Sequence, residues 1–348
     1  MPSKSTKPSS RKKSKRSSSK SAYLDQLIVG SSESMKAIPD DAVTLTVTSP
    51  PYWNAIDYDK HAADKTQNWK SREYSTGFQS YEEYLDLMAS IFREVQRVTK
   101  PGGICAVVVG TVLFKARPIP VPYDLVSRLC SHGWDFHQDI IWHKCTAGIK
   151  RAGVSIQKPM PGYFYPNIMT EYIMVFRKPG DRLGSDLDPE TRKQGSFPIN
   201  ELFVKDIANN VWHIAPVPPG MLDHPCPYPE EIPHRLCQLY SYPDDLVLDP
   251  FLGSGQTAKV AKALGRKYVG YDILEEFVSY SKSRLDEPLM VRPKQLIATF
   301  DKVDLDSPLS GPGRKSKNGK KVKMRSNQPI KPQDKREESD LFASADSG

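Results

Sequence analysis

The sequence has few cysteines and no long apolar run. Its five cysteines are scattered over 348 residues, and no two of them form a C-x-x-C pair. This spacing argues against a zinc site and against a disulfide framework, so we expect a reducing, cytoplasmic compartment. No stretch approaches the length that spans a membrane, and the N-terminus lacks the apolar core of a signal peptide. The sequence therefore predicts a globular protein of the cytoplasm.

A positive net charge is lacking in the body of the chain and is concentrated at its two ends. Residues 1–20 hold eight Lys and Arg and no acid, and residues 305–348 hold ten against six acids. Because the whole chain carries +8, the remaining body, 21–304, carries −4. Both ends are too poor in apolar residues to form a core, so we expect disordered basic tails. They would either remain solvated or contact a polyanion such as DNA.

Patterns of strands and helices alternate between the tails. Apolar residues at helical spacing predict helices over 81–98, 121–133, 229–241 and 256–265. Apolar or alternating runs predict strands over 43–48, 104–110, 136–144, 170–178, 245–250 and 267–273, with a strand or short amphipathic segment over 23–29. This alternation predicts an α/β fold with a mostly parallel sheet flanked by helices.

The stretch D-P-F-L-G-S-G (249–255) joins a predicted strand to a predicted helix. Gly253 and Gly255 allow a tight turn that a ligand can approach, and the helix that follows presents unpaired N–H groups there. Asp272 follows at about the 20-residue spacing of a carboxylate that holds a ribose diol. The turn matches neither G-x-G-x-x-G nor a P-loop. The pattern favours a turn that binds an adenosine-type cofactor over the alternative, an ordinary tight turn between a strand and a helix.

A second motif, S-P-P-Y (49–52), ends the predicted strand 43–48. Together with D-P-F-L-G-S-G, it resembles the motifs of S-adenosylmethionine-dependent DNA amino-methyltransferases, which methylate N4 of cytosine or N6 of adenine. The proline motif precedes the glycine motif by nearly 200 residues, which resembles the permuted β group. The resemblance covers about 23–286 and implies a class I, Rossmann-like methyltransferase fold with a seven-stranded-type sheet. Gln256 departs from the pattern, since threonine is common at this position.

The resemblance divides the chain into functional parts. It implies a catalytic half over 21–178, a small target-recognition insertion over 179–210 and a cofactor-binding half over 211–290. In the proline motif, the Ser49 side chain and the Pro50 carbonyl would accept the hydrogens of the target amine. Pro51 would stiffen this loop, and Tyr52 would stack on a base rotated out of the duplex. The residues implied in cofactor binding are Asp249, Phe251, Gly253, Ser254, Gly255, Thr257, Asp272 and Pro229.

In the family that the chain resembles, enzymes with serine at the first position of the proline motif mostly methylate cytosine N4. Ser49 therefore favours cytosine N4 as the target, with adenine N6 as the alternative. The resemblance further implies a double-stranded DNA substrate, a nucleoid-associated enzyme, no metal, and a monomer or weak dimer. It suggests the modification enzyme of a restriction–modification system, with a cognate endonuclease that acts on the same site. The alternative from another class is a catalytically silent protein that binds nucleic acid through its basic tails.

Overall fold

The computed structural model describes residues 22–53, 80–114, 117–144, 161, 168–197, 199–218, 220–224 and 226–291. All of them belong to the first of two units, 1–299, and the second unit comprises 300–348. The tails predicted at 1–20 and 305–348 lie outside the described residues. No helix in the described ranges is long and apolar enough to cross a membrane.

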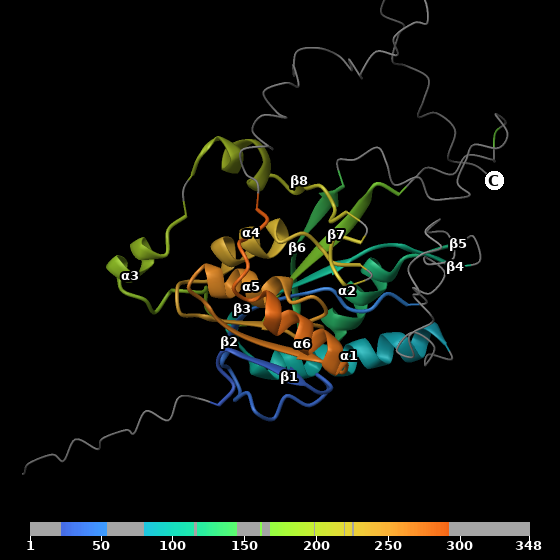
Figure 1. Cartoon of the computed structure of the whole chain (residues 1–348), viewed down its shortest axis with the longest axis horizontal. Helices are drawn as coiled ribbons and strands as arrows, with labels where there is room; N and C mark the ends of the chain where they lie inside the picture. Colours follow the sequence, from blue (N-terminus) through green and yellow to red (C-terminus); the bar gives the residue numbers. More distant parts are fainter. Residues whose placement is uncertain are drawn as a thin grey trace, which may run out of the picture. The chain divides into compact units, whose positions relative to one another are not determined.

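One eight-stranded sheet forms the centre of the first unit (Figure 1). Its strands are β1 (Gln26–Val29), β2 (Val43–Thr48), β3 (Thr99–Val109), β6 (Asp135–His143), β7 (Thr170–Arg177), β8 (Val211–His213), β9 (Leu246–Asp249) and β10 (Lys267–Asp272). Their order is β1-β10-β9-β2-β3-β7-β6-β8. Every neighbouring pair is parallel except those of β7, which runs antiparallel to β3 and β6. The predicted mostly parallel sheet is confirmed, with β8 added at its edge.

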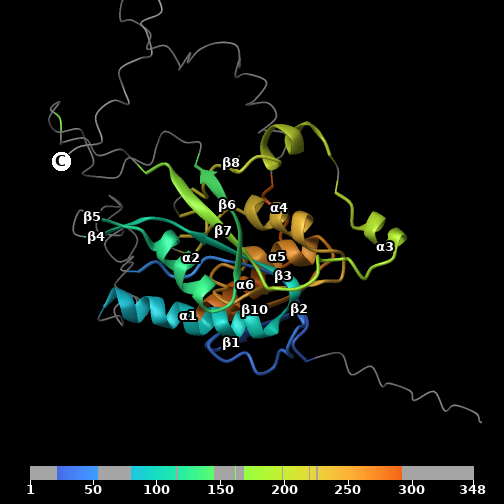
Figure 2. The same cartoon turned by 180° about the vertical axis from the view of Figure 1, so that it is seen from behind.

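Helices cover both faces of this sheet (Figures 1 and 2). They are α1 (Tyr81–Val98), α2 (Val121–Ser131), α4 (Glu231–Tyr240), α5 (Gln256–Ala263) and α6 (Glu275–Arg284). The short helix α3 (Pro189–Gln194) has no buried residue and lies apart from the sheet, and a π-helix (Phe203–Ile207) contacts β8. Apolar side chains of α1 and α2 pack in one core cluster, and those of α4, α5 and α6 pack in a second cluster that holds the opposite side chains of the strands. A small hairpin of β4 (Val112–Phe114) and β5 (Arg117–Ile119) completes the described elements.

Helix α1 matches its predicted range of 81–98. Its apolar residues at helical spacing are buried, among them Tyr84, Met88 and Val95. The helix begins at Ser80, whose side chain accepts a hydrogen bond from the Glu83 N–H at 3.1 Å. This capping bond satisfies one of the backbone donors that a helix start leaves unpaired.

Besides the short elements β4, β5, β8, α3 and the π-helix, which have no predicted counterpart, two longer elements differ from the sequence-based expectation. Strand β3 starts at Thr99, ahead of the predicted 104–110, because Thr99 pairs with Val43 of β2 and a register shift follows before Leu45 pairs with Ile104. Helix α6 has no predicted counterpart. Phe277 and Val278 are its only buried apolar residues, so its sequence carries no helical apolar stripe.

Candidate active site

The carboxyl ends of β2, β9 and β10 lie at one edge of the sheet. In the parallel register, Thr46 of β2 lies opposite Leu248 of β9, and Asp249 lies opposite Gly270 of β10. In the sheet, β9 lies between β10 and β2, and the chain runs from β9 to β10 on one side of β9. The direction of winding therefore changes between β9 and β2. Crevices at such switch points are the usual ligand sites of open α/β sheets. The proline motif and the glycine motif therefore meet at this edge.

A buried hydrogen bond joins the two motifs. The Thr48 hydroxyl donates to Oδ1 of Asp249 at 2.6 Å, and the Phe251 N–H donates to the same oxygen at 3.1 Å. The Tyr228 hydroxyl lies 3.1 Å from Oδ2. Asp249 is 1% exposed, and its burial raises the pKa of the carboxyl to about 6, against the lowering effect of these hydrogen bonds. Asp249 thus faces protein groups that connect the motifs.

Thr257 extends the same buried chain of contacts. Its hydroxyl lies 2.6 Å from the Tyr228 hydroxyl and donates to the Val47 carbonyl at 3.0 Å. Pro229, next to Tyr228, is also buried, and its carbonyl accepts from the N–H of Ile232 in the first turn of α4. The contacts of Thr257 and Tyr228 tie α5 and the segment before α4 to β2.

The glycine turn needs glycine at two positions. Gly253 has a φ of +49° and Gly255 a φ of +77°, in the region that other residues rarely adopt. A Cβ on Gly255 would lie 2.7 Å from Cβ of Ser281, and one on Gly253 would lie 2.7 Å from Nε2 of His224. Gly255 is the N-cap of α5, so the first N–H groups of that helix follow the turn directly. This is the local geometry that suits a ligand close to the backbone.

Asp272 stands beside this turn at the end of β10. Its Oδ2 accepts from the Gly253 N–H at 2.9 Å, and its Oδ1 accepts from the Leu274 N–H at 3.0 Å. Partial burial raises the pKa of this carboxyl, and the two backbone bonds oppose that rise. An ionised carboxylate can accept about four hydrogen bonds. It therefore has the capacity to accept the hydroxyl groups of a ribose as well, which fits an adenosine cofactor.

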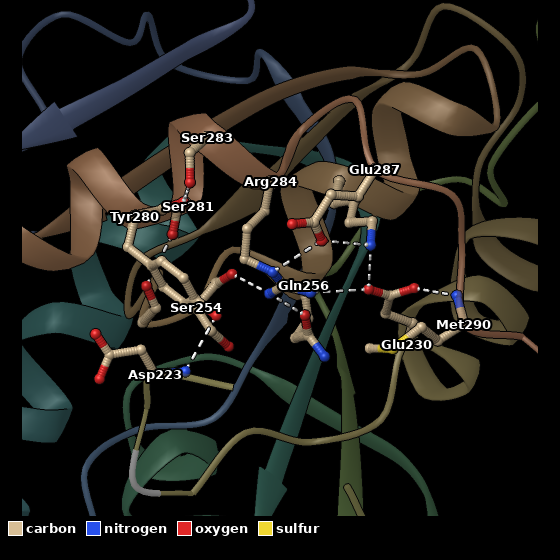
Figure 3. A network of polar contacts seen from close by, with 12 residues as sticks. Asp223, Glu230, Ser254, Gln256, Tyr280, Ser281, Ser283, Arg284, Glu287 and Met290 are labelled. Atoms are coloured by element: carbon tan, nitrogen blue, oxygen red, sulfur yellow. Dashed lines mark hydrogen bonds and ion pairs between the residues drawn. The ribbon is translucent and has the colours of Figure 1, made fainter. Parts of the chain in front are cut away.

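Side chains of α6 hold the carbonyl groups of the glycine turn (Figure 3). The Ser281 hydroxyl donates to the Gly253 carbonyl at 2.8 Å, and Arg284 donates to the Ser254 carbonyl at 2.6 Å. Arg284 also donates to Oε1 of Gln256 at 2.6 Å, and Nε2 of Gln256 donates to the Tyr228 carbonyl at 3.0 Å. Helix α6, which the sequence pattern did not predict, thus stabilises the glycine turn through hydrogen bonds to its carbonyl groups.

Buried charges surround this support. Glu230 accepts from Lys259 at 2.8 Å, from Arg284 at 3.1 Å and from the Met290 N–H at 2.6 Å. Glu287 contacts Lys259 at 3.3 Å and Arg284 at 3.2 Å. Two buried cations, each 1% exposed, therefore meet one buried carboxylate, Glu230, and one carboxylate, Glu287, whose side chain is 49% exposed. Buried charges are tolerated when they are paired and hydrogen-bonded in this way.

The proline motif leads from β2 toward the first helix. Ser49 is half-buried, Pro50 is buried, and Pro51 and Tyr52 are partly buried. The Tyr52 hydroxyl donates to Oε2 of Glu171 at 2.9 Å. The ring of Trp53, the last described residue here, lies 4.9 Å from the ring of Tyr81 and 4.8 Å from that of Phe114.

The structure brings the predicted site residues to one edge of the sheet, and it adds residues that sequence reasoning missed. The added residues are Thr48, Glu171, Tyr228, Ser281 and Arg284. None lies in the proline motif or in D-P-F-L-G-S-G, so their contacts in the folded protein reveal them. Within the part of the chain that the structure describes, no three His, Cys, Asp or Glu side chains gather as metal ligands.

The fold resembles that of a cofactor-bound protein of known structure. TTHA0409 of Thermus thermophilus, complexed with S-adenosyl-L-methionine, matches with a TM-score of 0.57 and 28% identity, over 75% of this chain and 92% of that chain. The PvuII DNA methyltransferase (cytosine-N4-specific) has the same fold, with a TM-score of 0.53 and 18% identity over 79% of this chain and 91% of that chain. With the glycine turn and Asp272 beside it, this fold defines an S-adenosylmethionine-dependent methyltransferase.

The sequence places the protein in a family. Residues 43–283 match the N6_N4_Mtase family, described as DNA methylase, and the chain belongs to this family. Among curated proteins, the Type II methyltransferase M.MthZI of Methanothermobacter thermautotrophicus is 28% identical over 275 residues, which are 74% of this chain and 75% of that protein. The predicted fold, cofactor and DNA methyltransferase activity are therefore confirmed.

Proposed function

We propose that the protein transfers a methyl group to N4 of cytosine in double-stranded DNA. The observation that carries this proposal is the position of Ser49. It follows Thr48, whose hydroxyl donates to Asp249 of the glycine motif, so the proline motif begins next to the strand end that leads into the cofactor turn. A hydroxyl differs from a carboxylate in charge and reach, and the cytosine-N4 enzymes of this family mostly have serine at this position.

The chemistry follows from the weakness of the target amine as a nucleophile. Its lone pair is delocalised into the aromatic ring. The Ser49 hydroxyl and the Pro50 carbonyl would accept the two amine hydrogens and turn the lone pair out of conjugation. Pro50 and Pro51 stiffen the loop and add no competing N–H donor. When bound, S-adenosylmethionine supplies an electrophilic methyl group, so positioning and electrostatics suffice for direct transfer.

The cofactor would lie on the glycine turn. The backbone of Gly253, Ser254 and Gly255 allows close approach, and Asp272 would accept the ribose hydroxyls. Phe251, partly buried, would contribute an apolar wall. Three further residues would support the turn through buried contacts within the protein: Asp249, Thr257 and Pro229.

The target base would leave the duplex and stack on Tyr52. Residues 179–210 would read the surrounding sequence. In this region α3 is exposed, and Lys193 on it could reach a base edge or a phosphate. Because a curated relative is a Type II methyltransferase, we propose a modification role beside a restriction endonuclease that acts on the same site, in an enzyme that works at the nucleoid as a monomer or weak dimer.

Modification-sensitive sequencing of DNA from cells that express the protein tests the proposal, with Ser49→Ala as a matched variant. We expect N4-methylcytosine at one short recognition sequence, and its loss in the variant. N6-methyladenine as the only product would reject cytosine in favour of the adenine alternative. Tight DNA binding without transfer of a labelled methyl group would instead support a catalytically silent DNA-binding protein.

A further inference from the structure

We propose that Glu171 and Lys144 form a positioning pair that fixes the ring of Tyr52, on which the target base would stack. The inference rests on the proposed stacking role of Tyr52. Glu171 is the second residue of β7, and Lys144 follows the end of β6. Because β7 runs antiparallel to its neighbours, its first residues lie at the carboxyl edge of β3 and β6. The pair thus lies at the same edge as the proline motif.

The contacts form a chain of three side chains. The Tyr52 hydroxyl donates to Oε2 of Glu171 at 2.9 Å, and the Lys144 ammonium group donates to Oε1. The two carboxylate oxygens are therefore bound from different elements. The side chains of Lys144 and Glu171 are 17% and 15% exposed, so water screens their attraction only partly. A hydrogen bond to a carboxylate is stronger than one between neutral groups.

The surroundings restrict where Glu171 can lie. Gly110, just after β3, lets the Glu171 side chain approach closely, since a Cβ there would lie 3.0 Å from Cγ of Glu171. Lys144 lies 4.9 Å from the ring centroid of Trp142, whose Nε1 donates to the Ile214 carbonyl at 2.8 Å. These neighbours hold the two ends of the pair before any base enters.

The pair would fix the orientation of the Tyr52 ring and so the orientation of the base that stacks on it. Tyr52 can turn about its side-chain bonds, and each turn would change the plane on which a base stacks. A ring held by its hydroxyl presents one plane, which places the exocyclic amine reproducibly beside Ser49. Lys144 also cancels the negative charge of Glu171, which would otherwise repel the phosphates of an incoming DNA strand.

The test is single-turnover methyl transfer to DNA by the full chain. Tyr52→Phe keeps the aromatic ring and removes the hydroxyl, and Glu171→Gln keeps the shape and removes the charge. We expect each change to slow the transfer step about tenfold, with KM for S-adenosylmethionine unchanged. Because both changes break one interaction, the double variant should be about as slow as the slower single variant.

Tyr123→Phe is the matched control. The Tyr123 hydroxyl donates to the hydroxyl of Tyr172 at 3.0 Å, and Tyr172 is the residue after Glu171 in the sequence. This hydrogen bond is separate from the one between Tyr52 and Glu171. It should leave the transfer rate within about twofold of wild type. A wild-type rate in Tyr52→Phe, or additive effects in the double variant, would overturn the positioning role. Failure of the wild-type enzyme to methylate any base would instead reject the proposed function.

Discussion

Thr48 and Asp249 stand 201 positions apart in the sequence, and a hydrogen bond of 2.6 Å joins their side chains. The bond connects the strand end that carries the proline motif with the first residue of the glycine motif. An amine acceptor and a methyl donor must be held at a defined separation for direct transfer. The Thr48–Asp249 contact provides such a fixed connection inside the protein.

Asp249 belongs to a buried chain of hydrogen-bonded groups that runs from β2 to α5. The Val47 carbonyl can only accept, so the Thr257 hydroxyl donates to it, and the Tyr228 hydroxyl then donates to Thr257. The Tyr228 hydroxyl also lies 3.1 Å from Oδ2 of Asp249 and donates toward this carboxylate oxygen. Burial outweighs the hydrogen bonds that Thr48, Phe251 and Tyr228 donate, and it raises the pKa of the Asp249 carboxyl to about 6.

We predict that Asp249→Asn is well tolerated near neutral pH, because an amide can donate to Tyr228 and accept from Thr48 as the neutral acid does. The folded pKa of about 6 lies above the ordinary value of 3.8. The stability that Asp249 contributes is therefore full below about pH 4 and is lost as pH rises through about 6. Denaturant unfolding should show wild type losing about 3 kcal/mol relative to the variant between pH 4 and 8.

A result that would contradict this prediction for Asp249 can be stated in the same measurement. A free-energy difference between wild type and Asp249→Asn that stays constant over this range would mean that the carboxyl is ionised throughout. Asp249→Ala provides the comparison, since it removes the contacts of both oxygens and should be destabilising at every pH.

Ser281→Ala should weaken cofactor binding without changing the DNA side of the site. Its hydroxyl holds the Gly253 carbonyl, so the variant loosens the turn on which the cofactor is proposed to lie. We expect roughly a 2- to 10-fold rise in Kd for S-adenosylmethionine, measured by calorimetry. Ser283→Ala is the control, because Ser283 donates to Tyr280 within the same helix. Equal Kd values for both variants would contradict the role of Ser281.

Gly255→Ala should destabilise the protein more than Gly265→Ala. Both glycines have similar positive φ values, +77° and +72°, so the backbone cost of a side chain is alike, about 1–2 kcal/mol. A Cβ at 265 meets nothing within 4 Å, whereas a Cβ at 255 meets Ser281 at 2.7 Å. The difference between the two free energies of unfolding isolates the close approach of α6 to the turn. Equal losses would show that the contact relaxes at no cost.

Gln256→Thr introduces the residue that is common at this position in the family, and we expect it to be harmful here. A threonine is too short to keep both the Arg284 and the Tyr228 contacts. The loss leaves a buried guanidinium short of one acceptor, which should cost about 1–3 kcal/mol in denaturant unfolding. Lys262→Gln removes an exposed ion pair with Asp286 and serves as the control, with a change below about 1 kcal/mol. A neutral Gln256→Thr variant would show that Arg284 finds another acceptor.

Local pattern was sufficient for the elements that carry strong periodicity or turn chemistry. Helix α1 followed from its apolar spacing, and the alternation of strands and helices predicted the parallel sheet. The sequence did not predict α6, because this helix buries few apolar residues, or β8, because this strand has only three residues. Their positions depend on partners distant in the chain, which no local pattern contains.

The sequence by itself determined the chemistry that the site offers: a hydroxyl and prolines at the end of one strand, two glycines after another, and an acid after a third. Those residues are local motifs, since short-range backbone geometry requires them. Only the tertiary structure decided that Asp249 faces inward to Thr48, that Arg284 holds the glycine turn and that Glu171 holds Tyr52. Each of these contacts joins residues that come together because the strands pair in an order different from the order of the sequence.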